Sequence, residues 1–223
     1  MDYNIDGLAP VVITNKIEIT ERVFIYQFKR AFNFEAGQVI GISVFDNTDE
    51  KMPRMYSIAS GNNDELVSIL FNVKETGWLT PLLAKKEVGD TIYITAPSGN
   101  FLDNNESAFW IATGTGIAPF HSMLQSGSSG QKTLIHGARK LDSFYFEDSF
   151  LNVNHLSYIR CCSQEEGNSI YFGRLTQYLK EYNNLPHDQK YYLCGVPEMV
   201  VEVRDILIDK GVPYQQIVAE IYF

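Results

Sequence analysis

Two patterns of hydrophobic and polar positions divide the chain. In the first hundred residues, short runs rich in β-branched and aromatic side chains are separated by Gly, Asn and Asp clusters, a pattern typical of antiparallel strands joined by turns. The expected strands are residues 11–19, 22–28, 38–45, 66–73 and 91–95, interrupted by one helical stretch at 78–86. This half therefore predicts a small antiparallel β-barrel or sandwich, and we expect the barrel.

In the second half, apolar runs alternate with amphipathic stretches. The expected strands are residues 107–113, 132–138, 156–162, 190–195 and 215–223, with helical stretches at 117–126, 141–150, 173–182 and 197–210 between them. Regular alternation of strand and helix is typical of an α/β domain whose parallel sheet is covered by helices. The segment 103–107 is polar and turn-prone, so we expect a β-barrel domain at residues 1–102 and an α/β domain at 103–223.

Composition and charge narrow the class of protein. Of the 223 residues, 45% are hydrophobic, which is enough for sizeable cores. The apolar runs are too short to span a bilayer and the acidic start is unlike a signal peptide, so we expect a cytoplasmic protein without a membrane segment. The net charge of −9 argues against a nucleic-acid partner. No heptad or long apolar stripe demands an oligomer, and we expect a monomer.

The cysteines and histidines show no metal-ligand spacing. Cys161 and Cys162 are adjacent, Cys194 is distant, and the four histidines are scattered. Three such cysteines supply neither a disulfide framework nor the ligands of an iron–sulfur cluster. We therefore expect a reducing compartment and no metal.

A glycine-rich segment, "TGTGIAPF" at 113–120, follows the first expected strand of the second half. Gly114 and Gly116 allow a tight turn close to a ligand, and Pro119 suits the first turn of a helix. Backbone amides at such a helix start favour a pyrophosphate. Pro119 replaces the third glycine of the dinucleotide fingerprint, so a plain tight turn remains the alternative.

A second segment, "RMYSIAS" at 54–60, combines a cation, an aromatic ring and a hydroxyl group. Because alternate strand side chains share a face, Arg54 and Tyr56 point one way and Ser57 the other. This arrangement suits a phosphate clamp beside a stacking platform. Cross-strand packing is the structural alternative.

The motifs "RMYS", "GWLT", "GTGIAP", "CGVPEMV" and the terminal "EIYF", in this order, resemble those of the ferredoxin–NADP⁺ reductase family, and the ending is similar to its bacterial short-chain branch. The resemblance covers essentially the whole chain. It implies an FAD-dependent oxidoreductase in which NADPH gives a hydride to flavin N5 and electrons pass to a one-electron carrier such as ferredoxin or flavodoxin.

The resemblance also implies an FAD site. Arg54 would contact the pyrophosphate, Tyr56 would stack on one flavin face, and Ser57 would donate a hydrogen bond near N5. Tyr222 would cover the second flavin face and Phe223 the adenine; a buried last strand is the alternative for this ending. The implied FAD-binding residues are Arg54, Met55, Tyr56, Ser57, Gly77, Trp78, Leu79, Thr80, Tyr222 and Phe223.

The implied nucleotide site lies in the second half. The NADP-binding residues by resemblance are Gly114, Thr115, Gly116, Arg139, Ser163, Arg174, Cys194 and Gly195. Arg139 and Arg174 suit a 2′-phosphate, which carries about two negative charges. Many relatives have an arginine where this chain has Gln164, so we expect NADPH to be preferred by a narrower margin than in those relatives.

The implied catalytic residues are Ser57, Cys194 and Glu220. Cys194 would lie beside the nicotinamide, and Glu220 would relay a proton through Ser57. Three alternatives stay open: an NAD(P)H-dependent free-flavin reductase, an electron-transfer flavin subunit of a larger complex, and a non-enzymatic regulator on the same fold.

Overall fold

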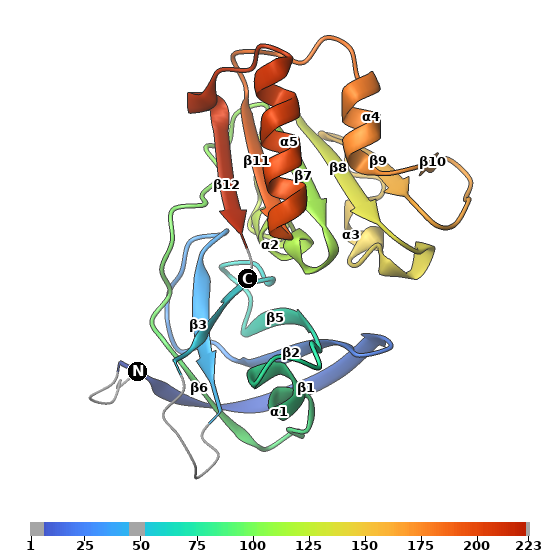
Figure 1. Cartoon of the computed structure of the whole chain (residues 1–223). Helices are drawn as coiled ribbons and strands as arrows, with labels where there is room; N and C mark the ends of the chain where they lie inside the picture. Colours follow the sequence, from blue (N-terminus) through green and yellow to red (C-terminus); the bar gives the residue numbers. More distant parts are fainter. Residues whose placement is uncertain (1–6, 45–51, 222–223) are drawn as a thin grey trace. The chain divides into compact units, whose positions relative to one another are not determined.

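The computed structural model describes residues 7–44 and 52–221 (Figure 1). The chain divides into two compact units. The first comprises residues 1–102 and 118–126, and the second comprises residues 103–117 and 127–223.

The first unit is built on an antiparallel six-stranded sheet with the strand order β4-β3-β6-β1-β2-β5. Its strands are β1 (Ala9–Thr20), β2 (Val23–Lys29), β3 (Val39–Ser43), β4 (Arg54–Ser57), β5 (Leu66–Asn72) and β6 (Thr91–Ile94). The long strand β1 pairs with β6 through residues 9–12 and with β2 through residues 13–20. A bridge between Ile58 and Ile69 joins the two edges of the sheet. The predicted antiparallel barrel is confirmed.

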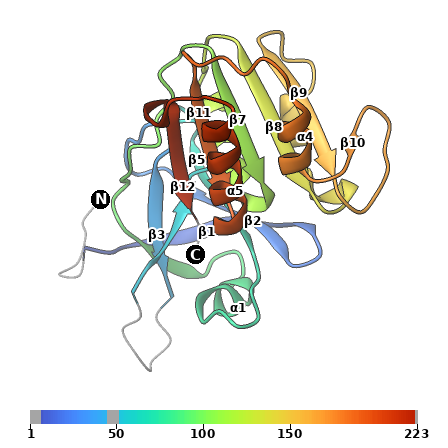
Figure 2. The same ribbon diagram turned by 45° about the horizontal axis from the view of Figure 1, so that its top comes forward.

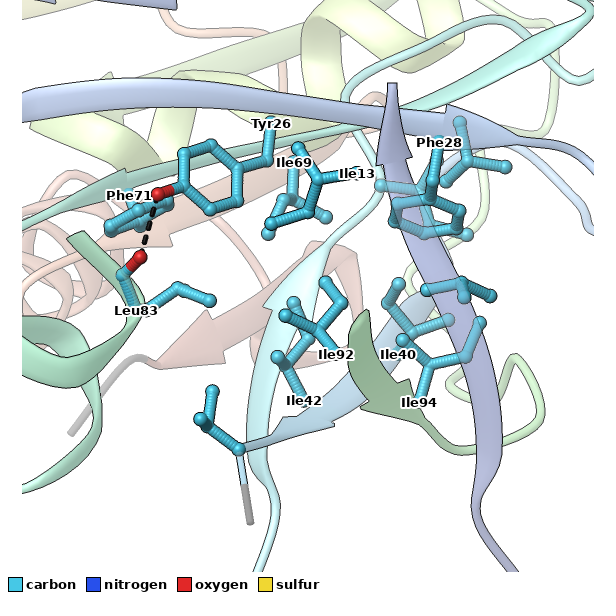
Figure 3. Packing of buried hydrophobic residues seen from close by; sticks show 14 of the residues in the cluster. Ile13, Tyr26, Phe28, Ile40, Ile42, Ile69, Phe71, Leu83, Ile92 and Ile94 are labelled. Carbon is cyan, nitrogen blue, oxygen red and sulfur yellow. Dashed lines mark hydrogen bonds between the residues drawn. The ribbon is translucent and has the colours of Figure 1, made fainter. Parts of the chain in front are cut away.

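The barrel core follows from the alternation of apolar residues along these strands. Ile40 and Ile42 on β3, Ile92 and Ile94 on β6, and Tyr26 on β2 are completely buried, and the close-up shows them facing one another (Figure 3). Burying one such aliphatic side chain contributes about 1.5–3 kcal/mol.

Helix α1 (Leu79–Ala84) packs on this core through Leu79 and Leu83. The Tyr26 hydroxyl donates a hydrogen bond to the Leu83 carbonyl at 2.6 Å, which satisfies the one polar group that the ring brings into the core (Figure 3).

Helix α2 (Ala118–Gln125) also belongs to the first unit, although it lies far from the barrel in sequence. The Ser122 hydroxyl donates to the Ser60 carbonyl at 2.7 Å, and His121 Nδ1 lies 2.6 Å from the Ala59 carbonyl oxygen. These contacts bind α2 to the segment that directly follows β4.

The second unit contains a parallel six-stranded sheet with the order β10-β9-β8-β7-β11-β12. Its strands are β7 (Ala108–Thr113), β8 (Lys132–Ala138), β9 (Leu156–Cys162), β10 (Tyr171–Phe172), β11 (Lys190–Gly195) and β12 (Ile217–Ile221). The chain proceeds outward from β7 to β8 and β9, and then returns to β11 on the other side of β7. The predicted α/β fold with a parallel sheet is confirmed.

Two helices cover one face of this sheet, α4 (Leu175–Glu181) and α5 (Pro197–Asp209) (Figures 1 and 2). Apolar residues of both helices, such as Leu179 and Val203, form one buried cluster with sheet residues such as Ile111 and Leu193. The remaining short elements are the 3-10 helices η1 (Gly114–Ile117), η2 (Leu141–Ser143) and η3 (Tyr214–Gln216) and the helix α3 (Glu147–Phe150).

The stretch 141–150 differs from the single helix that its pattern predicts. Phe146 has a left-handed backbone with φ of 59°, which no continuous right-handed helix can contain, and so η2 and α3 are separate. Two aromatic residues of this stretch contact the sheet: Phe144 lies edge-on to His136 of β8, and the Phe150 ring lies 5.6 Å from that of Tyr158 of β9.

Candidate cofactor-binding sites

Strand β4 carries the first set of predicted site residues, Arg54–Ser57. It pairs with β3, so that Tyr56 lies opposite Ile40 and Ser57 opposite Val39. Tyr56 is partly buried and its ring lies edge-on to Phe71 with the centroids 6.3 Å apart. Arg54 is exposed and Ser57 is buried. The strand thus offers an exposed cation next to a ring whose orientation the barrel core holds.

The environment of Tyr56 keeps its hydroxyl protonated. Burial raises the pKa of Tyr56, and the nearby Arg54 guanidinium only partly offsets this rise. The ring is therefore a neutral platform at physiological pH. Met55, between the two residues, leaves about half of its side chain exposed, at 46%.

The second predicted flavin segment, residues 77–80, forms a turn before α1. Trp78 occupies the N-cap position without a side-chain capping hydrogen bond to a described residue, and the Gly77 amide donates to the Lys74 carbonyl at 2.9 Å. The Thr80 hydroxyl accepts a hydrogen bond from the Lys74 amide at 2.9 Å. In this structure the Thr80 hydroxyl therefore stabilises the turn of residues 74–80. Leu79, the remaining residue of the segment, is buried in the barrel core.

In the second unit, the sheet order places the glycine-rich turn at a reversal point. β8 and β11 lie on opposite sides of β7, and ligands of open α/β sheets bind at the carboxyl ends of strands where the order reverses in this way. Gly114–Ile117 follows β7 directly at this edge as a 3-10 turn. Thr115 is half-buried within it.

Two predicted glycines are required for the carboxyl ends of β7 and β11 to approach each other. A Cβ on Gly116 would lie 2.4 Å from the Cys194 carbonyl oxygen, and a Cβ on Gly195 would lie 2.4 Å from Thr113 Oγ1. Gly195 also has a φ of 152°. Real Cβ atoms do not approach other atoms so closely, so only glycine fits at either position.

Thr113 supplies a polar atom that the sequence analysis missed. Its hydroxyl group is buried and has no hydrogen-bond partner among the described residues. Buried polar groups in native proteins are nearly always paired, so this hydroxyl is a candidate contact for a ligand at the edge. The sequence does not reveal this role, because the burial of a threonine at the end of a strand depends on both neighbouring strands.

The residues predicted for the 2′-phosphate follow the carboxyl ends of three consecutive parallel strands. Arg139 follows β8, Ser163 follows β9, and Arg174 lies two residues after β10. The Ser163 amide donates to the Ala138 carbonyl at 3.1 Å, so these strand ends are linked directly. The Arg139 side chain is exposed and forms no ion pair within residues 7–44 and 52–221.

Gln164 and Arg174 already make polar contacts within the protein. The backbone amide of Gln164 donates a hydrogen bond to the Arg139 carbonyl at 3.0 Å. Gln164 therefore links the ends of β8 and β9 through its backbone, although its side chain carries no charge. Arg174 Nη2 lies 3.2 Å from Glu202 Oε2 on α5, a contact that links residues far apart in sequence and that motif reading did not anticipate.

Two of the three predicted catalytic residues are neighbours in the second unit. Cys194 on β11 and Glu220 on β12 are paired in register. Cys194 is fully buried and Glu220 partly exposed. Ser57 belongs to the first unit. Tyr222 and Phe223 lie outside the described residues.

Within the described parts of the chain, no three His, Cys, Asp or Glu residues gather in a metal-binding arrangement. None of the helices in those parts has the length and apolarity needed to cross a bilayer. His136 lies on the sheet face opposite to α4 and α5, and burial lowers its pKa to about 3.

Known proteins resemble both units. Residues 10–102 match the oxidoreductase FAD-binding domain, and residues 110–205 match the oxidoreductase NAD-binding domain. A ferredoxin–NADP reductase of Azotobacter vinelandii is 26% identical over 228 residues, covering 82% of this chain and 83% of the relative. The toluate 1,2-dioxygenase electron transfer component of Pseudomonas putida is 26% identical over 220 residues, covering 90% of this chain and 63% of the relative.

A solved structure agrees with the fold. The ferredoxin NADP⁺ reductase of Neisseria gonorrhoeae, with bound FAD and NADP, superposes with a TM-score of 0.87 at 23% identity, over 97% of this chain and 99% of that chain. Several curated relatives are longer, and the chain spans about half to two thirds of their length.

An FAD-binding barrel followed by a nicotinamide-nucleotide-binding α/β domain defines a flavin-dependent oxidoreductase. The chain belongs to the ferredoxin–NADP⁺ reductase family, an oxidoreductase family whose cofactors are FAD and a nicotinamide dinucleotide.

Proposed function

We propose that this enzyme passes electrons between NADPH and a small one-electron carrier, a ferredoxin or a flavodoxin, by way of FAD. The observation that carries the proposal is the reversal point of the parallel sheet. There, Gly116 and Gly195 leave no room for a Cβ. Among the described residues, the buried Thr113 hydroxyl has no hydrogen-bond partner, and Arg139, which follows the neighbouring strand β8, forms no ion pair.

The first unit fits FAD. An exposed guanidinium suits the pyrophosphate, because Arg presents several donors in a fixed geometry. Tyr56 adds an aromatic surface that the Phe71 contact orients before FAD binds. Aromatic stacking contributes about 0.5–1.5 kcal/mol beyond the area that it buries. We assign FAD binding to residues 1–102, with Arg54–Ser57 and residues 77–80 as its contacts.

The second unit fits a nicotinamide nucleotide. The turn Gly114–Ile117 offers backbone amides at the switch point, and the Thr113 hydroxyl lacks a hydrogen-bond partner among the described residues until a ligand supplies one. We assign this nucleotide to residues 103–223. The phosphate preference, NADPH before NADH, rests on Arg139 and Arg174 together.

FAD supplies the chemistry that the side chains lack, because it accepts two electrons as a hydride and releases them one at a time. The protein orients the reactants and excludes water. We assign Ser57 a hydrogen-bonding role at the flavin, Cys194 a steric role at the nicotinamide, and Glu220 the transfer of a proton. The register pair of Cys194 and Glu220 supports a shared role for these two residues.

The carrier and the cellular setting are inferred from chemistry. Three buried cysteines that form no disulfide fit a reducing compartment, and we place the enzyme in the cytoplasm as a monomer. The Pseudomonas relative, named as the electron transfer component of a dioxygenase, favours one other candidate: a subunit that serves a single oxygenase system.

Anaerobic stopped-flow reduction tests the proposal. The purified protein should be yellow, and NADPH should bleach its flavin band faster than NADH does. Added ferredoxin or flavodoxin should then restore the band while the carrier becomes reduced. A flavin that washes off the protein, or one that is reduced by NADH only, would favour the free-flavin reductase. Reduction of a dioxygenase ferredoxin alone would favour the oxygenase subunit.

A further inference from the structure

The further inference concerns Glu202, which lies in the second turn of α5 and contacts a cation of the strand-end edge. Arg174 Nη2 donates to Glu202 Oε2 at 3.2 Å. Lys180 on α4 approaches Oε1 of the same carboxylate at 3.5 Å. One carboxylate therefore links both helices that cover this face, and it holds one of the two arginines assigned to the 2′-phosphate.

This ion pair lies at the surface and is weak enough to be broken. The Arg174 side chain is 66% exposed and that of Glu202 is 32% exposed. Exposed pairs contribute little, because water screens both charges. A phosphate with about two negative charges offers Arg174 a stronger partner, and its oxygens match the guanidinium geometry. Arg174 can thus exchange Glu202 for a phosphate, but it must first lose the carboxylate.

The two arginines of the edge differ for this reason. Arg139 forms no ion pair with any described residue, so its positive charge is available at once. Arg174 is available only after Glu202 has been displaced. The sequence therefore supplies Arg174 as a second cation, but its ion pair with Glu202 reduces its attraction for a phosphate.

We propose that Glu202 is a specificity-determining residue whose carboxylate competes with the 2′-phosphate of NADP(H) for Arg174, and so narrows discrimination against NAD(H). The inference rests on the proposed nucleotide site. NAD(H) has a hydroxyl group at this position and makes no comparable demand on Arg174. Glu202 thereby weakens the binding of one nucleotide and leaves the other unchanged.

Calorimetric titration of the flavin-loaded protein with 2′-phospho-AMP and with AMP measures this competition without turnover. Glu202→Gln should tighten 2′-phospho-AMP binding by about twofold to fivefold, the effect expected of an exposed charge pair, and leave AMP binding unchanged. The gain should shrink at high salt, because screening weakens both partners.

Two further variants make the result specific. Asp209→Asn removes one negative charge from the same helix about two turns further along and should give no gain, because Asp209 has no contact with Arg174. Arg174→Ala combined with Glu202→Gln should abolish the gain, because the released cation is then absent.

The outcomes separate the two proposals. Unchanged or weaker 2′-phospho-AMP binding in Glu202→Gln, with normal binding by the parent protein, would overturn the competition and show that Glu202 only positions Arg174. An equal gain of 2′-phospho-AMP affinity in Asp209→Asn would show that the effect comes from the net charge of the protein and not from the contact with Arg174. A parent protein that binds neither ligand would refute the nucleotide site itself.

Discussion

The two candidate cofactor sites are constructed in different ways. On the barrel, the flavin segment is four consecutive residues of one strand, Arg54–Ser57, which pairs with β3 and packs through Tyr56 against Phe71 of β5. On the parallel sheet, the nucleotide edge collects residues from the ends of β7, β8, β9 and β11, which are separated along the whole second half of the sequence. A contiguous site depends on local side chains, whereas an assembled site depends on the packing of its whole sheet.

Breaking the sheet far from the edge should therefore disable the assembled site. The fully buried Lys132 ammonium group, at the start of β8, pairs with Asp103 at 3.0 Å and lies over the Trp110 ring. Lys132→Ala should lower the free energy of unfolding by about 3–5 kcal/mol, because Asp103 is left buried and unpaired. Denaturant unfolding measures this loss.

A matched double variant tests the cause of that loss. Lys132→Met with Asp103→Asn removes both charges and should recover part of the stability and of the 2′-phospho-AMP binding. If the double variant is as unstable as Lys132→Ala, the charge pair is not the reason for the loss.

Acid should act on the same unit through His136. Its pKa of about 3 in the folded state lies below the ordinary value of 6.5, so the neutral form is favoured by folding. The unfolded chain then binds more protons below about pH 6.5, and stability is complete above that pH and is lost as the pH falls toward 3. The expected slope from this group is about 1.4 kcal/mol per pH unit.

His136→Phe should flatten this acid limb in pH-dependent unfolding experiments, at some cost in stability because the Tyr158 hydroxyl loses its contact with His136 Nδ1. His187→Gln, which removes a histidine at an exposed position, is the matched control. An unaltered slope in His136→Phe would assign the acid limb to other groups.

At the edge itself, Gly116→Ala should destabilise the protein by about 1–3 kcal/mol and weaken nucleotide binding, because the new Cβ collides with the Cys194 carbonyl oxygen. Gly114→Ala is the comparison: its φ is 55° and a Cβ there meets no atom within 4 Å, so only the left-handed backbone cost of about 1–2 kcal/mol applies. Thermal melts and calorimetry distinguish collision from strain. Equal losses in the two variants would contradict the close approach of β7 and β11.

The contiguous site should respond locally. Tyr56→Leu should weaken FAD binding by about threefold to tenfold through the lost ring and leave nucleotide binding nearly unchanged. Tyr56→Phe keeps the ring and should retain FAD. Fluorescence of released flavin measures both variants. Loss of nucleotide binding in Tyr56→Leu would show that the two sites are not as independent as their construction indicates.

Much of this architecture was readable from hydrophobic pattern alone. The predicted strands 132–138, 156–162 and 190–195 agree with β8, β9 and β11, because a buried parallel strand must be apolar along its whole length. The short strand β10 was missed, since two residues are too few to show a period. The stretch 141–150 was read as one helix because its apolar spacing does not reveal the left-handed Phe146.

The sequence by itself determined the two fold classes, the flavin segment and the residue types of the nucleotide edge, because these depend on local periodicity and on motifs of adjacent residues. Only the tertiary structure decided that Thr113 has a buried hydroxyl with no partner among the described residues, that α2 is bound to the barrel through Ser122, and that Glu202 occupies Arg174. Each of these facts joins residues that are distant in the chain. Sequence spacing carries no information on such distances until the sheet order is known.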